Sequence, residues 1–113
     1  MKPYDLEERT FEFARDCRLL ISKLPKSIAN NEDGKQLVRS SGSVGANYIE
    51  ANEKLGEKDF TFRLKIARKE AKESAYWLKL LKSTNSDMNK EIEDNLQEAQ
   101  ELRRILSAII NKI

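Results

Sequence analysis

The side chains that could do chemistry in this sequence are carboxylates, amines and guanidiniums, because its 113 residues contain no histidine and one cysteine, Cys17. Nucleophilic triads of the usual Ser-His or Cys-His kind and the common Cys/His zinc sites therefore cannot be assembled. A single cysteine also forms no internal disulfide. We expect Cys17 to be a small buried apolar residue, with no histidine base to activate its thiol.

A polar stripe runs beside the apolar face of the helix that the sequence predicts at about 35–54. Its members recur at steps of four, four and three residues, and two carboxylates on the next predicted helix are candidate partners. The full set is Arg39, Ser43, Asn47, Glu50, Glu70 and Glu73. Such a stripe either meets water or forms a partly buried network, in which Arg39 pairs with a carboxylate and Asn47 bridges two helices.

The glutamates of this stripe also raise the possibility of a carboxylate-bridged metal pair of the ferritin kind. That site includes histidines from two Glu-x-x-His pairs, whereas residues 70–73 carry a second glutamate where the histidine should be. No glycine-rich loop opens a helix as a phosphate cradle, and paired carboxylates alone do not indicate hydrolysis. We expect no metal, no cofactor and no catalytic residue, and keep a carboxylate metal enzyme as the remote alternative.

Basic residues are concentrated in one segment of a chain whose formal net charge is only +2. Residues 58–82 hold eight basic and three acidic side chains, whereas 83–113 hold four basic and six acidic. Lysines at intervals of seven line one side of the helix predicted at 58–82, and further cations flank them. The candidate phosphate contacts are Lys58, Lys65, Arg68, Lys69, Lys72 and Lys79. This row is either a solubility stripe or a surface that binds nucleic acid.

The elements that must position these side chains follow from apolar residues spaced alternately three and four apart, which indicate amphipathic helices. Four such helices are predicted, at about 5–23, 35–54, 58–82 and 87–112. Short links favour one domain of the all-α class, an antiparallel up-down-up-down four-helix bundle. Gly42 and Gly45 share one face of the second helix, where a neighbouring helix can approach closely.

A second apolar strip lies off the main seams of the last two predicted helices. Its members are Phe62, Ile66, Trp77, Leu80, Ile105 and Ile110. A helix that is apolar on two sides packs in its own bundle and against something else, so we expect these residues to form contacts between subunits. The same strip would serve an adaptor that binds another protein, because apolar side chains do not name their partner.

Two passages of the sequence are similar to those of a known family. They are residues 39–51, RSSGSVGANYIEA, and 59–81, DFTFRLKIARKEAKESAYWLKLL, and residues 24–26, LPK, are similar to a link in the same family. The passages resemble the bacterial four-helix bundle proteins encoded in intervening sequences of large-subunit ribosomal RNA genes. The chain departs from the family's common form at Ala51, where glycine usually follows the glutamate.

The resemblance implies a function that composition and spacing do not show. Relatives include the accessory variability determinant of diversity-generating retroelements, a pentameric barrel of bundles that binds nucleic acid and partners a reverse transcriptase. By similarity we expect a homopentamer with a basic surface, RNA somewhat favoured over DNA as its ligand, and the family's polar positions in a structural role. The alternative is a protein-protein adaptor with no nucleic-acid role.

No apolar run approaches the roughly 20 residues needed to cross a bilayer, and the sequence opens on no basic start with an apolar run and cleavage site. We therefore expect a cytoplasmic protein with no membrane partner.

Overall fold

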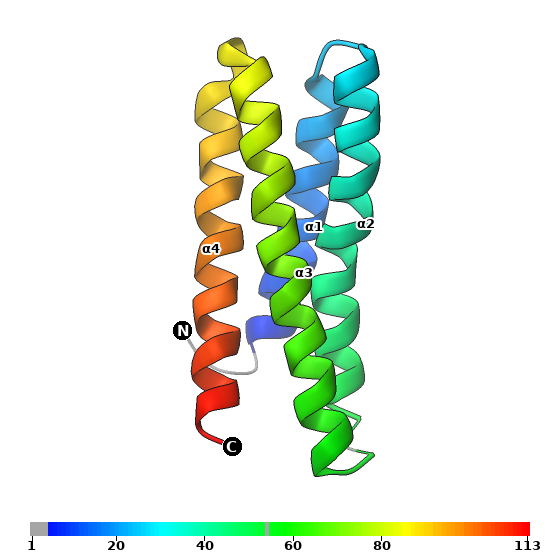
Figure 1. Cartoon of the computed structure of the whole chain (residues 1–113), viewed down its shortest axis with the longest axis vertical. Helices are drawn as coiled ribbons and strands as arrows, with labels where there is room; N and C mark the ends of the chain where they lie inside the picture. Colours follow the sequence, from blue (N-terminus) through cyan, green and yellow to red (C-terminus); the bar gives the residue numbers. More distant parts are fainter. Residues whose placement is uncertain (1–4, 54) are drawn as a thin grey trace.

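Four long helices run alternately up and down and make up most of the structure (Figure 1). They are α1 (Asp5–Lys23), α2 (Ile28–Ala51), α3 (Glu57–Thr84) and α4 (Asn89–Asn111), with a short 3-10 turn, η1 (Ser86–Met88), before α4. The computed structural model describes residues 5–53 and 55–113. Each helix packs against its neighbours in sequence, and α1 also contacts α4, which closes the ring. The predicted all-α antiparallel four-helix bundle is confirmed.

The core consists of one apolar stripe from each helix. Its largest fully buried side chains are Leu6, Phe13, Leu20, Leu37, Val44, Leu64, Leu78, Leu81, Ile92, Leu102 and Leu106. Alternating steps of three and four residues keep each stripe facing the bundle axis, as in other bundles whose helices cross at small angles. The remaining faces of α2, α3 and α4 are free to carry polar and charged side chains.

The start of α2 differs from the prediction, because the helix begins at Ile28 and not at residue 35. Ser27 is its N-cap, and its hydroxyl oxygen accepts a hydrogen bond from the backbone N–H of Asn30 at 3.0 Å. Gly34, which resembled a linker residue, is buried in the helix, where a Cβ would lie 3.3 Å from Ile21 of α1. The segment predicted as a connection therefore adds nearly two turns of helix.

The link between α2 and α3, by contrast, is longer than predicted. The helix ends at Ala51 and not at residue 54, and Leu55, which lies in the link, is 81% exposed. Gly56 precedes the first residue of α3 with a φ of +135°, a backbone conformation that residues with a Cβ rarely adopt. A glycine is therefore needed where the chain turns into α3.

The glycines inside α2 allow a close approach of α1. A Cβ at Gly45 would lie 2.9 Å from the hydroxyl oxygen of Thr10 and 3.2 Å from its Cβ. At Gly42 the nearest atom would be Nη2 of Arg18 at 3.1 Å, the end of a long flexible side chain. The close helix contact predicted at these glycines is present, its partner is α1, and it is tightest at Gly45.

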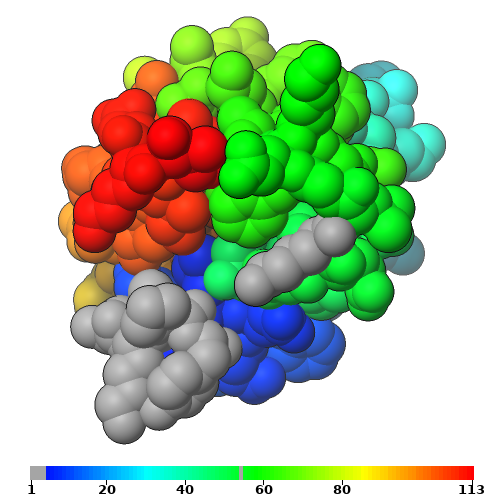
Figure 2. Space-filling model, turned by 90° about the horizontal axis from the view of Figure 1, so that it is seen from below, coloured from blue at the N-terminus to red at the C-terminus, as the bar shows by residue number. Residues whose placement is uncertain are grey.

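The two ends of the bundle are closed differently. The α1–α2 and α3–α4 links share the upper end in Figure 1, and the α2–α3 link lies at the lower end. Viewed from below, the end of α4 lies beside the start of α3 (Figure 2), where Phe62 and Ile113 line one shallow depression.

None of the helices in the described part of the chain is long and apolar enough to cross a bilayer.

Candidate nucleic-acid interface

Four of the six basic residues predicted on α3 gather around one shallow groove between α3 and α4. They are Lys65, Arg68, Lys69 and Lys72. Lys58 lies in the adjoining depression at the start of α3, which Lys65 also lines. Lys79 follows Lys72 by seven residues, about 10 Å further along the helix. The predicted row therefore has a cluster at its centre and one lysine beyond each end.

The structure adds a cation that sequence analysis missed, Arg103 of α4, which lines the same groove together with Ser107. The Ser107 hydroxyl oxygen accepts a hydrogen bond from Nη1 of Arg68 at 3.5 Å, so the groove is joined across the two helices. Arg103 lies in the segment whose acidic residues outnumber its basic ones. Arg103 faces α3 because of the way in which α4 is rotated about its own axis, and the sequence does not reveal that rotation.

We call the side chains Lys65, Arg68, Lys69, Lys72 and Arg103 the basic groove. Among the described residues, none of these five cations forms an ion pair. Several other cations of α3 and α4 are paired, as where Lys82 bonds Glu93 at 2.6 Å and lowers the pKa of that carboxyl. The positive charge of the groove is therefore left for a ligand to neutralise, and it favours anions.

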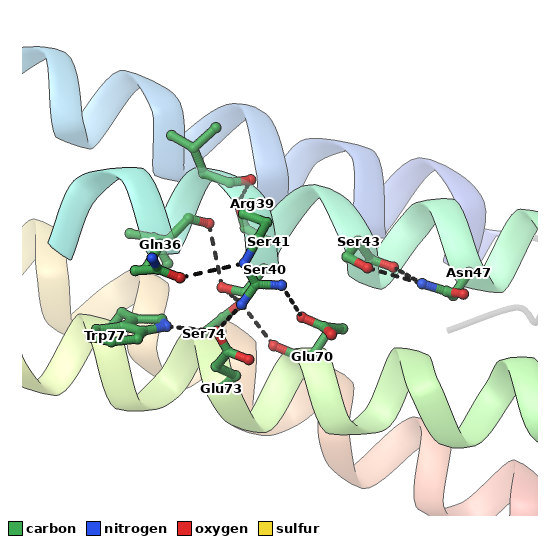
Figure 3. Close-up of polar contacts among 12 residues, drawn as sticks. Gln36, Arg39, Ser40, Ser41, Ser43, Asn47, Glu70, Glu73, Ser74 and Trp77 are labelled. Carbon is green, nitrogen blue, oxygen red and sulfur yellow. Dashed lines mark hydrogen bonds and ion pairs between the residues drawn. The ribbon is translucent and has the colours of Figure 1, made fainter. Parts of the chain in front are cut away.

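At the α2–α3 interface, Arg39 of α2 joins two glutamates of α3 (Figure 3). Its Nη1 lies 3.2 Å from Oε1 of Glu70, and its Nη2 contacts Oε2 of Glu73. The indole N–H of Trp77 donates to the same Glu73 oxygen at 2.9 Å. Burial raises the pKa of Glu73, but the hydrogen bonds from Trp77 and Arg39 outweigh it and hold this pKa below its usual value. The Glu73 carboxylate in turn raises the pKa of Arg39.

This arrangement bears on the metal alternative, because Arg39 occupies the carboxylates of Glu70 and Glu73 that a bridged metal pair would use. In the described residues, no group of three or more histidine, cysteine, aspartate or glutamate side chains is arranged to hold a metal ion.

Burial raises the pKa of the Cys17 thiol to about 12, against a smaller lowering by a hydrogen bond with Ser41. The thiol is therefore protonated and enclosed.

Asn47 carries the polar network further along α2 and α3. Its side-chain amide donates to the carbonyl and hydroxyl oxygens of Ser43, each at 2.9 Å, and its Oδ1 accepts a bond from Arg63 of α3 at 3.5 Å. Asn47 thus bridges the two helices as predicted, through a partner that was not predicted. Glu50 is exposed, and no hydrogen bond or ion pair joins it to the other predicted members of the network.

Two buried serines also face each other between α2 and α3, and the sequence did not indicate that they form a pair. The Ser40 and Ser74 hydroxyl groups share a hydrogen bond of 2.9 Å, and the Ser74 hydroxyl lies 2.9 Å from the carbonyl oxygen of Glu70 (Figure 3). Both residues are fully buried, so the small polar side chains let α2 and α3 approach closely without leaving an unsatisfied group.

A second polar pair, also missed, joins the first turn of α2 to the link after α3, at the upper end of the bundle. Asn30 donates to the Oδ1 of Asn85 at 2.9 Å, and Asn85 donates to the Oδ1 of Asn30 at 2.8 Å. Their amide groups also donate to the carbonyl oxygens of Pro25 and Leu81. Both residues resembled ordinary loop asparagines, and 55 positions separate them. A single sequence carries no signal that pairs them.

The residues predicted as subunit contacts are exposed to different extents. Phe62 is 60% exposed, whereas Ile66 and Leu80 are half-buried. Trp77, Ile105 and Ile110 pack partly against the core of their own chain. The strip is therefore most accessible at Phe62, near the start of α3.

The fold and these contacts define a class of protein: a closed antiparallel four-helix bundle whose middle helices share a polar seam and whose third and fourth helices share a basic groove. The family model of the 23S rRNA-intervening sequence proteins matches residues 3–108, and the chain belongs to that family. The predicted resemblance is confirmed.

A solved structure shares this fold over nearly the whole chain. It is the crystal structure of a protein of unknown function from the S23 ribosomal protein family of Bacteroides thetaiotaomicron, with 32% sequence identity and a TM-score of 0.78. The similarity covers 92% of this chain and 96% of that one. No curated protein matches the chain.

Proposed function

We propose that this chain is a non-enzymatic accessory protein that binds nucleic acid as a homo-oligomer, with RNA favoured over DNA. The observation that carries the proposal is the basic groove, in which five cations from α3 and α4 face one surface without an ion pair in the described part of the chain. A phosphate backbone that enters such a surface releases its condensed counterions, which is the main source of affinity in non-specific binding.

The preference for RNA is supported by the family to which the chain belongs, whose members are described by their place in sequences that intervene in 23S rRNA. The solved relative is likewise assigned to a ribosomal protein family. Nothing in the groove distinguishes ribose from deoxyribose by itself, so RNA and DNA must be compared directly.

A homo-oligomer, which we propose to be a pentamer, would repeat the groove around a symmetry axis and multiply a field that is modest in one chain. The accessible end of the apolar strip, around Phe62, is the proposed contact. Light scattering tests this: we expect a particle of five times the 13.1 kDa chain mass, and a clean monomer would refute the oligomer.

The binding test is fluorescence anisotropy with labelled RNA and DNA over a salt series. We expect Lys69→Glu with Lys72→Glu to abolish binding at low salt. The matched control is Lys35→Glu with Lys90→Glu, which changes the net charge equally at exposed lysines already paired with Glu32 and Asp94. Equal losses in the two double variants would show that net charge, and not the groove, governs binding.

A protein-protein adaptor is the second candidate, and one observation favours it. A largely apolar groove between α1 and α2 is lined by Phe11, Ala14, Gly42, Ala46 and Ile49 among others, and Phe11 and Ile49 are 60% and 47% exposed. If the wild-type chain binds neither RNA nor DNA at low salt, this surface becomes the leading site.

Elemental analysis tests the remaining alternative: bound iron or manganese in the purified protein would favour a carboxylate metal enzyme.

A further inference from the structure

We infer that the basic groove binds the phosphates of a nucleic-acid double helix without reading its bases, and that Arg103 of α4 supplies one of the contacts. The inference rests on the proposed function and specifies its ligand. It follows from which side chains line the groove, how they are spaced, and how two adjacent arginines of α4 differ.

In the described part of the chain, the groove has no aromatic side chain on which an unpaired base could stack. Its lining consists of the five cations and Ser107. Sites for single strands combine cations with aromatic rings on which the unpaired bases stack, and base edges are usually read by amides or arginines inserted into a duplex groove. Among the described residues no aromatic or amide side chain lines this groove, and the one hydroxyl is already hydrogen-bonded to Arg68. The lysines and arginines that remain are the side chains that most often contact phosphates.

The spacing of the cations suits a backbone with regularly placed charges. Lys65 and Lys72 are separated by about 10 Å along α3, the rise of roughly three base pairs. Lys58 and Lys79 extend the row to about 31 Å, close to the ~34 Å of one turn of B-form DNA. A duplex presents about one charge per 1.7 Å and holds its phosphates at fixed spacing, whereas a single strand is less charged and must be ordered on binding.

One exposed aromatic ring lies outside the groove, in the depression that adjoins it. Phe62 is 60% exposed in the adjoining depression with Lys58 and Lys65, and Glu57 and Ile113 line the same depression. If single strands were the ligand, this ring would be the platform beside the cations. Phe62 therefore serves to test the opposite mode of binding.

Arg103 and its neighbour Arg104 provide a matched pair on one helix. Arg103 lines the basic groove. Arg104 lies in a different depression with acidic residues such as Glu93 and Asp94, and its Nη1 donates to Glu101 at 2.8 Å. The two side chains have the same chemistry and differ in face and in partner. Truncating each in turn separates a contact in the groove from a change in total charge.

The experiment measures anisotropy of the full chain with a labelled RNA duplex of about 20 base pairs, roughly two turns, and with one of its strands. We expect the duplex to bind more tightly, and two duplexes of unrelated sequence to bind equally. Five contacts per subunit give a slope of log K against log salt of about −4.5, which Arg103→Ala reduces to about −3.6. The same loss of one contact weakens binding about fifteenfold at about 50 mM salt and about fourfold at about 200 mM.

Arg104→Ala is the control, with an expected change of less than about twofold at about 200 mM salt, where exposed charges are screened within less than about 8 Å. Circular dichroism melts check that both variants are folded. Equal effects of the two substitutions on a chain that still binds nucleic acid would exclude α4 from the site while the proposed function stands.

Tighter binding of the single strand, with a larger loss in Phe62→Ala than in Arg103→Ala, would overturn the duplex assignment in favour of stacking. Failure of the wild-type chain to bind either form at low salt would overturn the proposed function itself, and this inference with it. If the chain binds the duplex more tightly than the single strand, and Arg103→Ala weakens binding more than Arg104→Ala does, the proposed function and this inference are both supported.

Discussion

The buried amide pair between Asn30 and Asn85 joins the first turn of α2 to the link after α3, and its removal tests how the α1–α2 and α3–α4 hairpins are held together. The side chains exchange two hydrogen bonds, of 2.9 and 2.8 Å, and the residues are 7% and 8% exposed. Because the pair is reciprocal, removing either side chain leaves a buried polar atom of the other without its partner.

The expected magnitude follows from which bonds survive. In Asn85→Ala, the amide of Asn30 still donates to the carbonyl oxygen of Pro25, but the Oδ1 of Asn30 loses its donor. A buried acceptor left unsatisfied costs about 1–3 kcal/mol, so we expect about 2–3 kcal/mol for either single substitution by alanine. The double variant should cost less than the sum by about 1–2 kcal/mol, because the second substitution removes the group that the first had stranded.

Urea unfolding followed by the fluorescence of the single tryptophan, Trp77, measures these free energies, provided that the slope with denaturant is unchanged. Asn31→Ala is the matched control, since this exposed asparagine is the next residue of the same helix and should change stability by less than about 0.5 kcal/mol. Additive single effects, or an Asn85→Ala variant no less stable than the control, would refute the reasoning.

The substitution Asn85→Asp adds a dependence on pH with a definite sign. Burial raises the pKa of a carboxyl above its unfolded value of about 3.9, so the variant's stability is greatest below that pH and is lost as pH rises through the folded pKa. The protonated carboxyl can donate to the Oδ1 of Asn30, which the ionised form cannot. The gap in stability from wild type should therefore widen with rising pH, and a constant gap would contradict a buried location.

Three further outcomes are expected. Gly45→Ala should lower stability by about 1–3 kcal/mol in thermal unfolding because its Cβ would meet Thr10, whereas Gly42→Ala should be neutral or stabilising by up to about 1 kcal/mol; equal effects would contradict the packing. A thiol reagent at about pH 8 should label native Cys17 only as fast as the chain opens, since the pKa of the buried thiol is raised to about 12; rapid labelling would place it at the surface. The ionised Glu73, whose pKa is lowered, should stabilise the fold above the unfolded pKa of about 4.3 and lose this effect as pH falls through the folded pKa; a Glu73→Gln variant with an unaltered acid profile would exclude this contribution.

The core and the helix types were predictable because they depend on local apolar spacing. The residues of α1 at Leu6, Phe13 and Leu20 are all buried, as their spacing indicates. The start of α2 was not predictable in this way, because asparagine and glycine, the residues at 30 and 34, are types that usually form links between helices. Here one is buried in a hydrogen-bonded pair and the other is packed against α1, so tertiary contacts outweigh their low helix propensity.

The candidate site was predictable only in part, for a similar reason. The spacing of Lys65, Lys69 and Lys72 placed them on one side of α3, but whether their charges were neutralised depended on the face that α4 presents. Arg39 was expected to pair with a carboxylate and contacts two. Glu50 shares the same stripe and does not join the network, because its position on α2 leaves it exposed.

The sequence by itself determined four amphipathic helices, the stripe that each one buries and the basic character of α3, because periodicity and charge are properties of a single segment. Only the tertiary structure decided that Arg103 and not Arg104 faces that basic row, and that Asn30 meets Asn85. These pairings depend on the rotation of each helix about its own axis and on bringing together two residues that lie 55 positions apart. Packing of the whole bundle sets both, and no local pattern records them.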